Sequence, residues 1–289
     1  IAFFLVRMGA KSVEIQHYGK VNLSLHIEMK RPDGYHKIDT LMQEVAVSDI
    51  LVMKKSDATG LRCNLADVPT DESNLVLRAY RRLQSVYGLD PVRFELQKSI
   101  PAGAGMGGGS ANAAAALAGL NDLFRLELTK DELAAIGLEL GADVPFFLTG
   151  GTCRAQGIGE ELTPLPGYCV PILLINDGTH AQTSAVYQAG PERTQTTIPE
   201  LMEELKAKKR RLTVANDLRA AAFRLYPKLE QTLTAIQNTG PATVQLSGTG
   251  ATFYAVYKNE KEAERAFAQL ENRFSMLVLT HTRGEGCRG

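Results

Sequence analysis

A glycine-rich segment between Pro101 and Ser110 carries the residue types that most directly indicate chemistry. It reads Pro-Ala-Gly-Ala-Gly-Met-Gly-Gly-Gly-Ser and leads into an alanine-rich stretch that ends near Phe124. Glycines let backbone N–H groups approach an anion closely, and the positive end of a helix capped by Ser110 reinforces them. We expect a phosphate-binding loop rather than a tightly packed turn, which is the structural alternative. The residues predicted to bind phosphate are Pro101, Ala102, Gly103, Ala104, Gly105, Met106, Gly107, Gly108, Gly109, Ser110 and Ala111.

Two other kinds of phosphate loop are excluded by their context. The stretch from Gly103 to Gly108 satisfies the G-x-G-x-x-G pattern of dinucleotide-binding folds. Such a fold needs a continuous apolar strand before the loop and an acidic residue at the end of a second strand about 20 residues later. Here the residues from Val92 to Leu96 alternate between apolar and polar, and Asp122 falls in a predicted helix. A nicotinamide-dependent oxidoreductase is therefore excluded, and so is a Walker loop, because no Gly-Lys-Ser/Thr follows the glycines.

The glycine loop is one of five motifs in the chain, and together these motifs resemble a known family. Further motifs in the same order are Lys20-Val-Asn22-Leu-Ser-Leu, Arg31-Pro-Asp-Gly-Tyr35-His36, Gly141-Ala-Asp143-Val-Pro145 and Leu246-Ser-Gly-Thr-Gly250-Ala. This set is similar to the GHMP kinases, which comprise galacto-, homoserine, mevalonate and phosphomevalonate kinases. The resemblance implies an α+β protein with two domains. The N-terminal domain would be like ribosomal protein S5, and the C-terminal domain would be a ferredoxin-like α/β sandwich.

The same resemblance implies an ATP-dependent small-molecule kinase with Mg²⁺ as the accompanying ion. Asp143 would be the general base that takes a proton from the substrate hydroxyl, and Lys20 would sit beside it. A nearby ammonium keeps a carboxylate ionised and offsets negative charge on the attacking oxygen. The structural alternatives are that Asp143 caps the helix that follows it and that Lys20 is an ordinary surface lysine.

Four residues match positions where family members that act on a cytidine diphosphate compound bind the base. By this resemblance Asn22, Tyr35, His36 and Tyr187 bind substrate, with aromatic rings stacking on cytosine as in other nucleotide-binding proteins. The implied reaction phosphorylates the 2-hydroxyl of an alcohol that carries a cytidine diphosphate group. The alternatives are a turn for Tyr35 and His36 and a helix-core position for Tyr187.

One departure from the family pattern affects the predicted metal site. The family often has two serines and an Asp after the glycines, whereas here Ser110 is followed by Ala111 and Asn112. Ser110 is therefore the one predicted side-chain ligand for Mg-ATP. Two rival functions stay open: another GHMP kinase that acts on mevalonate or homoserine, and a ligand sensor that has lost catalysis. Tyr35 and His36 argue against the first, and Lys20 with Asp143 argues against the second.

The predicted elements place these motifs at the ends of strands and helices. Alternating apolar residues predict extended chain over 13–27 and 40–47 around a turn at 30–34, and strands over 92–96, 170–175, 243–247, 252–257 and 276–280. Helices are expected from a Ser73 cap to Gly88, from Ser110 to about Phe124, and from a Thr129–Glu132 capping box to Gly141. Two more are expected over 215–236 and 260–270.

Composition limits the remaining possibilities. The 289 residues include 32 basic and 32 acidic side chains, so no net field favours nucleic acid or an anionic membrane. We expect domains over 8–163 and 164–289, a small-molecule substrate, and a monomer or weak homodimer. The four cysteines lack metal or C-x-x-C spacing, which favours a reduced, cytoplasmic setting. The first seven residues, which precede Met8, are expected to lie upstream of the native start.

Overall fold

The chain folds into two compact units in the computed structural model, which describes residues 5–9, 11–195 and 198–287. Unit 1 comprises Ile1–Gly19, Val47–Ala102 and Gly107–Gly150, and unit 2 comprises Lys20–Ala46, Gly103–Met106 and Gly151–Gly289. Two long strands, β2 (Ser12–Lys30) and β3 (His36–Lys55), contribute residues to both units. The predicted domain boundary after residue 163 stays a prediction.

Unit 1 contains a mixed sheet built around the first part of β2 and the last part of β3. Its strand order is β1 (Leu5–Gly9), β2, β3, β5 (Val92–Gln97) and β4 (Gly60–Cys63). β4 runs parallel to β5, whereas β5 is antiparallel to β3 and β1 is antiparallel to β2. The alternation read from the sequence is confirmed, because Val92, Phe94 and Leu96 are buried and their neighbours are more exposed. The expectation about residues 1–7 stays untested, and residues 1–4 lie outside the described residues.

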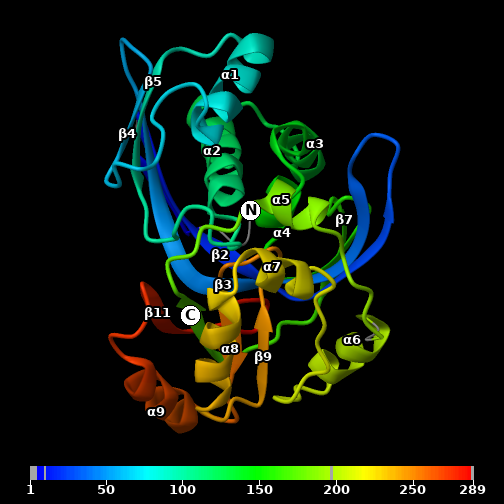
Figure 1. Cartoon of the computed structure of the whole chain (residues 1–289). Helices are drawn as coiled ribbons and strands as arrows, with labels where there is room; N and C mark the ends of the chain where they lie inside the picture. Colours follow the sequence, from blue (N-terminus) through cyan, green and yellow to red (C-terminus); the bar gives the residue numbers. More distant parts are fainter. Residues whose placement is uncertain (1–4, 10, 196–197, 288–289) are drawn as a thin grey trace. The chain divides into compact units, whose positions relative to one another are not determined.

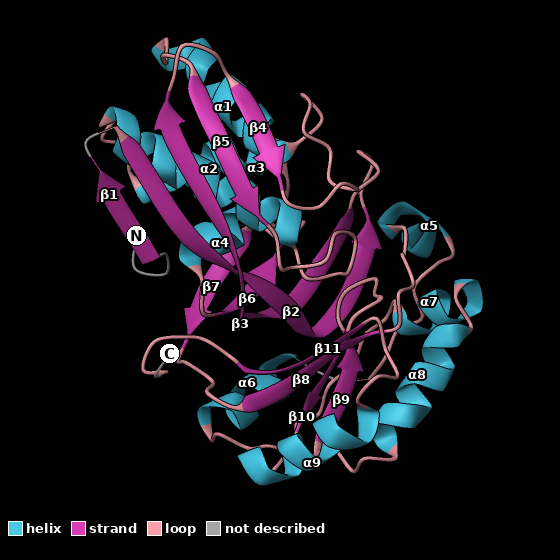
Figure 2. Cartoon of the chain, turned by 90° about the vertical axis from the view of Figure 1, so that its left-hand side faces the viewer, coloured by secondary structure: helices cyan, strands magenta, loops and turns pink. Residues whose placement is uncertain are grey.

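Helices α1 (Leu75–Tyr87), α2 (Gly108–Phe124) and α3 (Lys130–Leu140) and the short α4 (Val144–Thr149) complete unit 1. Figure 2 shows α1 and α2 on one face of the sheet. The Thr129–Glu132 capping box is confirmed. The predicted Ser73 cap is wrong by one residue: Asn74 accepts the Val76 N–H, while Ser73 bonds instead to Asp71.

Helix α2 begins earlier than predicted. Its N-cap is Gly107, whose φ of 68° is left-handed, so Ser110 is the third helical residue and not the cap. The helix is packed on small side chains: Ala113 to Ala116 are fully buried. A Cβ added at Gly119 would come within 2.0 Å of Met53 Cε. Small side chains therefore allow the helix to lie this close to the sheet.

Unit 2 contains the other ends of β2 and β3 and a separate antiparallel sheet. β6 (Thr152–Gln156) pairs with β3 and with β7 (Glu161–Leu165). The separate sheet has the order β11 (Met276–His281), β8 (Pro171–Asn176), β10 (Phe253–Val256), β9 (Thr243–Leu246). All four strands match predicted ranges within two residues, because each is a short apolar run bounded by turn residues.

The helices of unit 2 are α5 (Thr183–Gln188), α6 (Ile198–Lys206), α7 (Arg219–Leu225), α8 (Lys228–Gln237) and α9 (Glu260–Leu270). Figures 1 and 2 show α7, α8 and α9 along the second sheet, and buried residues of all three pack with those of β8 and β10. The helix predicted over 215–236 is two helices, because Pro227 lacks an N–H and interrupts the hydrogen-bond ladder. Across the described residues, no helix has both the length and the apolar character to cross a membrane.

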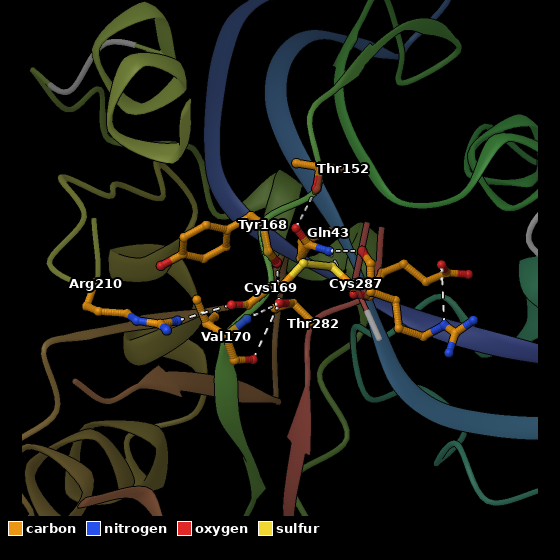
Figure 3. Close-up of a disulfide and its surroundings, with 10 residues drawn as sticks. Gln43, Thr152, Tyr168, Cys169, Val170, Arg210, Thr282 and Cys287 are labelled. Carbon is orange, nitrogen blue, oxygen red and sulfur yellow. Dashed lines mark hydrogen bonds and ion pairs between the residues drawn. A yellow bond between two sulfur atoms is a disulfide. The ribbon is translucent and has the colours of Figure 1, made fainter. Parts of the chain in front are cut away.

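A disulfide joins Cys169, just before β8, to Cys287 (Figure 3). The expectation of reduced cysteines is therefore wrong for this pair. The two residues are 118 positions apart, so no local spacing signalled the bond. They meet because Thr282 pairs with the strand edge: its Oγ1 donates to Tyr168 O and accepts from Val170 N at 2.9 Å.

Candidate active site

The glycine loop is divided between the two units, and each part is held by its own unit. Gly107 to Ser110 belong to unit 1, together with Asp143. Gly103 to Met106 belong to unit 2, together with Lys20, Asn22, Tyr35, His36 and Tyr187.

In unit 1 the glycines form the amino-terminal end of α2. Ala111 N donates to Gly107 O at 2.9 Å, which is the first hydrogen bond of the helix. The N–H groups of Gly108, Gly109 and Ser110 precede that bond, so helix geometry directs them out of the helix end. Gly109 is exposed and Ser110 is half-buried. This end of α2 can bind an anion through consecutive backbone amides.

The segment that carries Asp143 lies beside Ser110 in the same unit. A Cβ built at Gly141 would be 3.8 Å from Ser110 Oγ. Asp143 occupies the N-cap position of α4, yet its side chain makes no capping hydrogen bond. Capping therefore does not explain the carboxylate. Hydroxyl and carboxylate oxygens are the kinds of ligand that Mg²⁺ prefers.

In unit 2 Lys20 is a buried residue, so the surface-lysine alternative is wrong. Its Nζ donates to Asn22 Oδ1 at 2.7 Å, and Asn22 Nδ2 donates to Thr40 Oγ1 at 3.0 Å. Thr40 Oγ1 in turn donates to Ser24 O at 2.6 Å. This chain of hydrogen bonds fixes the orientation of the ammonium group and of the Asn22 amide. Lys20 and Asn22 were predicted as separate site residues, and the structure joins them.

The part of the loop in unit 2 rests on the motif at Leu246–Ala251. Ser247 Oγ donates to Gly105 O at 3.1 Å and Thr252 N donates to Ala104 O at 3.2 Å. Gly105 has a φ of 74°, and an added Cβ would lie 2.7 Å from Gly250 O. Ser247 was not among the predicted site residues, although its motif was singled out, because its contact with the loop is long-range.

Two of the aromatic residues predicted to bind the base come together in unit 2. The rings of His36 and Tyr187 have centroids 4.9 Å apart and planes tilted by 32°. Burial and the nearby Lys30 ammonium lower the pKa of His36, which favours the neutral imidazole. Tyr187 also packs against the core of the unit. Tyr35 is 58% exposed in the turn that was its structural alternative, where its N–H donates to Asp33 Oδ1 at 3.1 Å.

Metal-binding clusters of three or more His, Cys, Asp or Glu side chains do not occur in the described part of the chain. Two of the four histidines that the sequence left without a role lie near a carboxylate: His26 is 3.7 Å from Asp217 and His281 is 3.1 Å from Glu260. A third, His180, lies near the glycine loop, since its Nδ1 would be 3.5 Å from a Cβ added at Gly103. The fourth, His17, is fully buried.

Comparison with known proteins identifies relatives over nearly the whole chain. Family models described as GHMP kinases N terminal domain and GHMP kinases C terminal match residues 74–151 and 197–275. The 4-diphosphocytidyl-2-C-methyl-D-erythritol kinase of Moorella thermoacetica is 36% identical, over 92% of this chain and 97% of that protein. The enzyme of that name from Brucella suis is 38% identical, over 91% and 93%.

Solved structures give the same result for the fold. A crystal structure of 4-(cytidine 5'-diphospho)-2C-methyl-D-erythritol kinase matches with a TM-score of 0.81 and 32% identity, covering 94% of this chain and 99% of that one. A homoserine kinase from Cytophaga hutchinsonii, at 18% identity, matches with a TM-score of 0.72, covering 95% and 96%. The predicted two-domain α+β fold is confirmed.

Proposed function

The chain belongs to the GHMP kinase family, and from that premise we propose that it phosphorylates 4-diphosphocytidyl-2-C-methyl-D-erythritol. The reaction transfers the terminal phosphoryl group of ATP to the 2-hydroxyl and gives the 2-phosphate and ADP. It belongs to the non-mevalonate route to isoprenoid precursors. The observation that carries the proposal is 36% identity to a kinase of that name over 97% of its length.

The phosphoryl-transfer machinery is assigned to the loop, Asp143 and Lys20. The amides at the start of α2 bind the phosphates, and Asp143 takes the proton of the attacking hydroxyl. A positioned base contributes about 10²- to 10⁴-fold to rate, and alignment and charge stabilisation supply most of the rest. Lys20, oriented by Asn22, neutralises negative charge that builds during transfer.

Mg²⁺ is proposed to arrive with ATP, with Ser110 as its side-chain ligand. The ion would neutralise phosphate charge when bound. The proximity of Ser110 Oγ to the Gly141–Asp143 segment supports this assignment, because oxygen donors on both segments suit the ion.

The cytosine base is proposed to bind beside His36 and Tyr187, with Asn22 reading polar atoms and Tyr35 folding over from its exposed turn. The flat rings of His36 and Tyr187 can stack on a pyrimidine, and a neutral imidazole suits an uncharged base. The contact between the His36 and Tyr187 rings supports the pocket.

The test is coupled ADP release with Mg-ATP and each of three acceptors: the cytidylated substrate, mevalonate and homoserine. We expect turnover only with the cytidylated substrate. Asp143→Asn should reduce kcat by about 10²- to 10⁴-fold and leave ATP binding intact, whereas Asp131→Asn, at an exposed helical position, should be unchanged. Turnover of mevalonate or homoserine would overturn the substrate, and ATP binding without transfer would favour the sensor.

We propose a cytoplasmic setting and a monomer or weak homodimer. We also propose that the protein has no nucleic-acid or membrane partner, because its acidic and basic residues balance.

The Cys169–Cys287 pair makes the cytoplasmic setting testable, because disulfides are rare in reducing cytosol. Protein denatured and alkylated in a single step during lysis, so that the buried Cys153 is accessible, should show four modified cysteines if the setting is reducing. Two modified cysteines would contradict it.

A further inference from the structure

A buried polar cluster in unit 1 has no part in the proposed chemistry. It consists of His17 on β2, Asp49 on β3, Lys98 after β5 and Asn112 on α2, and each is at most 6% exposed. Burying ionised side chains costs several kcal/mol per ion unless hydrogen bonds compensate. Because burial of such a cluster is costly, its fixed geometry is expected to serve a structural role.

Asp49 ties down the chain that leads into the glycine loop. Its Oδ1 accepts the N–H groups of Ser99 at 2.7 Å and Ile100 at 2.8 Å, and its Oδ2 accepts from Lys98 Nζ. Lys98 is further fixed through its backbone, since its N–H donates to Asn64 Oδ1 at 2.7 Å and its carbonyl accepts from Asn64 Nδ2 at 3.1 Å. The segment before Pro101 is thus held on both sides.

Asn112 connects this anchor to the other flank of the loop. One edge of its amide faces three acceptors: Asp49 Oδ2 at 2.9 Å, Gly108 O at 2.9 Å and His17 Nε2 at 2.7 Å. Its other edge faces Lys98 Nζ at 3.2 Å. The orientation with Nδ2 toward the acceptors and the oxygen toward the ammonium satisfies both edges.

His17 fits this arrangement as a neutral ring. Burial lowers the pKa of His17, and its Nδ1 lies 3.5 Å from Ile15 O, which leaves Nε2 as an acceptor for Asn112. Gly108 completes the packing, because a Cβ there would be 2.9 Å from Ile100 Cγ2 and 3.2 Å from Lys98 Nζ. A cation near a helix N-terminus is unfavourable alone, and Asp49 offsets it.

We propose that Asn112 and Asp49 are positioning residues for the nucleotide. Asp49 holds the Ser99–Ile100 side of the loop and Asn112 holds the Gly108 carbonyl, so that the amides of Gly109 and Ser110 face the phosphates in a fixed direction. Neither side chain is expected to touch ATP. The inference rests on the proposed kinase function, since it concerns how that nucleotide is bound.

The test compares Asn112→Ala with Asn121→Ala, a matched change on the same helix. Asn121, at the far end of α2, also hydrogen-bonds to backbone. Its Oδ1 accepts from Leu128 N at 3.0 Å and its Nδ2 donates to Leu128 O at 3.2 Å. Measured quantities are the Kd for ATP by calorimetry, KM for ATP and for the acceptor, kcat, and Tm.

We expect Asn112→Ala to raise Kd and KM for ATP about tenfold, which corresponds to about 1.4 kcal/mol. KM for the acceptor should change less than about twofold, and Asn121→Ala should lower Tm comparably without changing either ATP constant. Equal ATP constants in the two variants would overturn the inference. If wild-type protein binds ATP but transfers nothing, the kinase proposal fails, and the ATP Kd values still decide the positioning role.

Discussion

The two parts of the glycine loop are held by different kinds of interaction. In unit 1 the start of α2 is held by a buried ion pair between Lys98 and Asp49. Asn112 connects this pair to the helix through the carbonyl of Gly108. In unit 2 the residues from Gly103 to Met106 are held by neutral hydrogen bonds from Ser247 and from backbone N–H groups. The charged support lies under the helix end that is proposed to bind an anion, whereas the neutral support satisfies the carbonyls of an irregular segment.

The buried carboxylates of the two units differ in the same way. Asp49 has an ammonium and two backbone amides as partners. Glu44 in unit 2 has Arg283 at 3.7 Å and a 3.4 Å hydrogen bond from Gly151 N. Burial therefore dominates at Glu44 and raises its pKa to about 7. Asp49 is thus surrounded by hydrogen-bond donors, whereas the partial compensation at Glu44 leaves a titrating acid in unit 2.

The largest effect should come from breaking the ion pair of unit 1. Asp49→Asn leaves the Lys98 ammonium buried without its counter-charge and should lower the free energy of unfolding by about 3–5 kcal/mol. Chemical denaturation measures it, with the exposed Asp131→Asn as control. Adding Lys98→Met should recover much of the loss, because both charges are then gone. A loss below about 1 kcal/mol would show that the pair is unimportant.

Glu44 should make stability depend on pH. Glu44 binds a proton more tightly in the folded protein than in the unfolded chain, so the stability that Glu44 contributes is fully present below pH 4.5 and is lost as pH rises through about 7. The raised pKa corresponds to about 3 kcal/mol. The stability of Glu44→Gln relative to wild type should therefore rise by that amount between pH 4.5 and 8. Parallel curves for the two proteins would contradict this, and Glu161→Gln, an exposed acid, is the control.

Gly105→Ala tests the close packing of the neutral part of the loop. The new Cβ would meet Gly250 O at 2.7 Å and Ser247 O at 2.9 Å, at a φ of 74°. We expect a loss of about 2 kcal/mol in unfolding free energy. Gly60→Ala is the matched control, since nothing lies within 4 Å of its Cβ position and its φ is not left-handed. Equal effects at the two positions would rule out the packing argument.

The smallest effect should follow loss of a single hydroxyl. Ser247→Ala removes the bond to Gly105 O and the acceptor for Asn22 N at 3.1 Å. The expected cost is about 1 kcal/mol, in denaturation experiments beside Ser85→Ala, whose hydroxyl is exposed. A cost as large as that of Asp49→Asn would remove the distinction between the charged and the neutral support.

Local signals made part of this molecule predictable. The Thr129–Glu132 capping box and the Gly88 helix end each depend on residues within one turn, and both are confirmed. The Ser110 cap was wrong because the helix starts two residues before the serine, at Gly108, after a left-handed Gly107. Glycine also fits at 108 because Ile100 and Lys98 leave no room for a Cβ there.

The supports of the site lay beyond sequence reasoning because their partners are distant in the chain. Asp49 and Lys98 are 49 positions apart, and Asn112 is 95 positions from His17. Asn112 was noted only as a departure from the family pattern. The catalytic roles of Asp143 and Lys20 and the substrate roles of Asn22, Tyr35, His36 and Tyr187 stay predictions.

The alanine-rich packing of α2 also bears on how this sequence can evolve. From Ala113 to Ala116 no side chain reaches solvent, and Gly119 sits against Met53. At such positions volume, and not hydrophobicity, decides which substitutions survive. Valine or leucine at these positions would overpack the interface between helix and sheet, which typically costs about 1–3 kcal/mol. In a saturation-mutagenesis map, this helix would stand out as tolerating only the smallest residues.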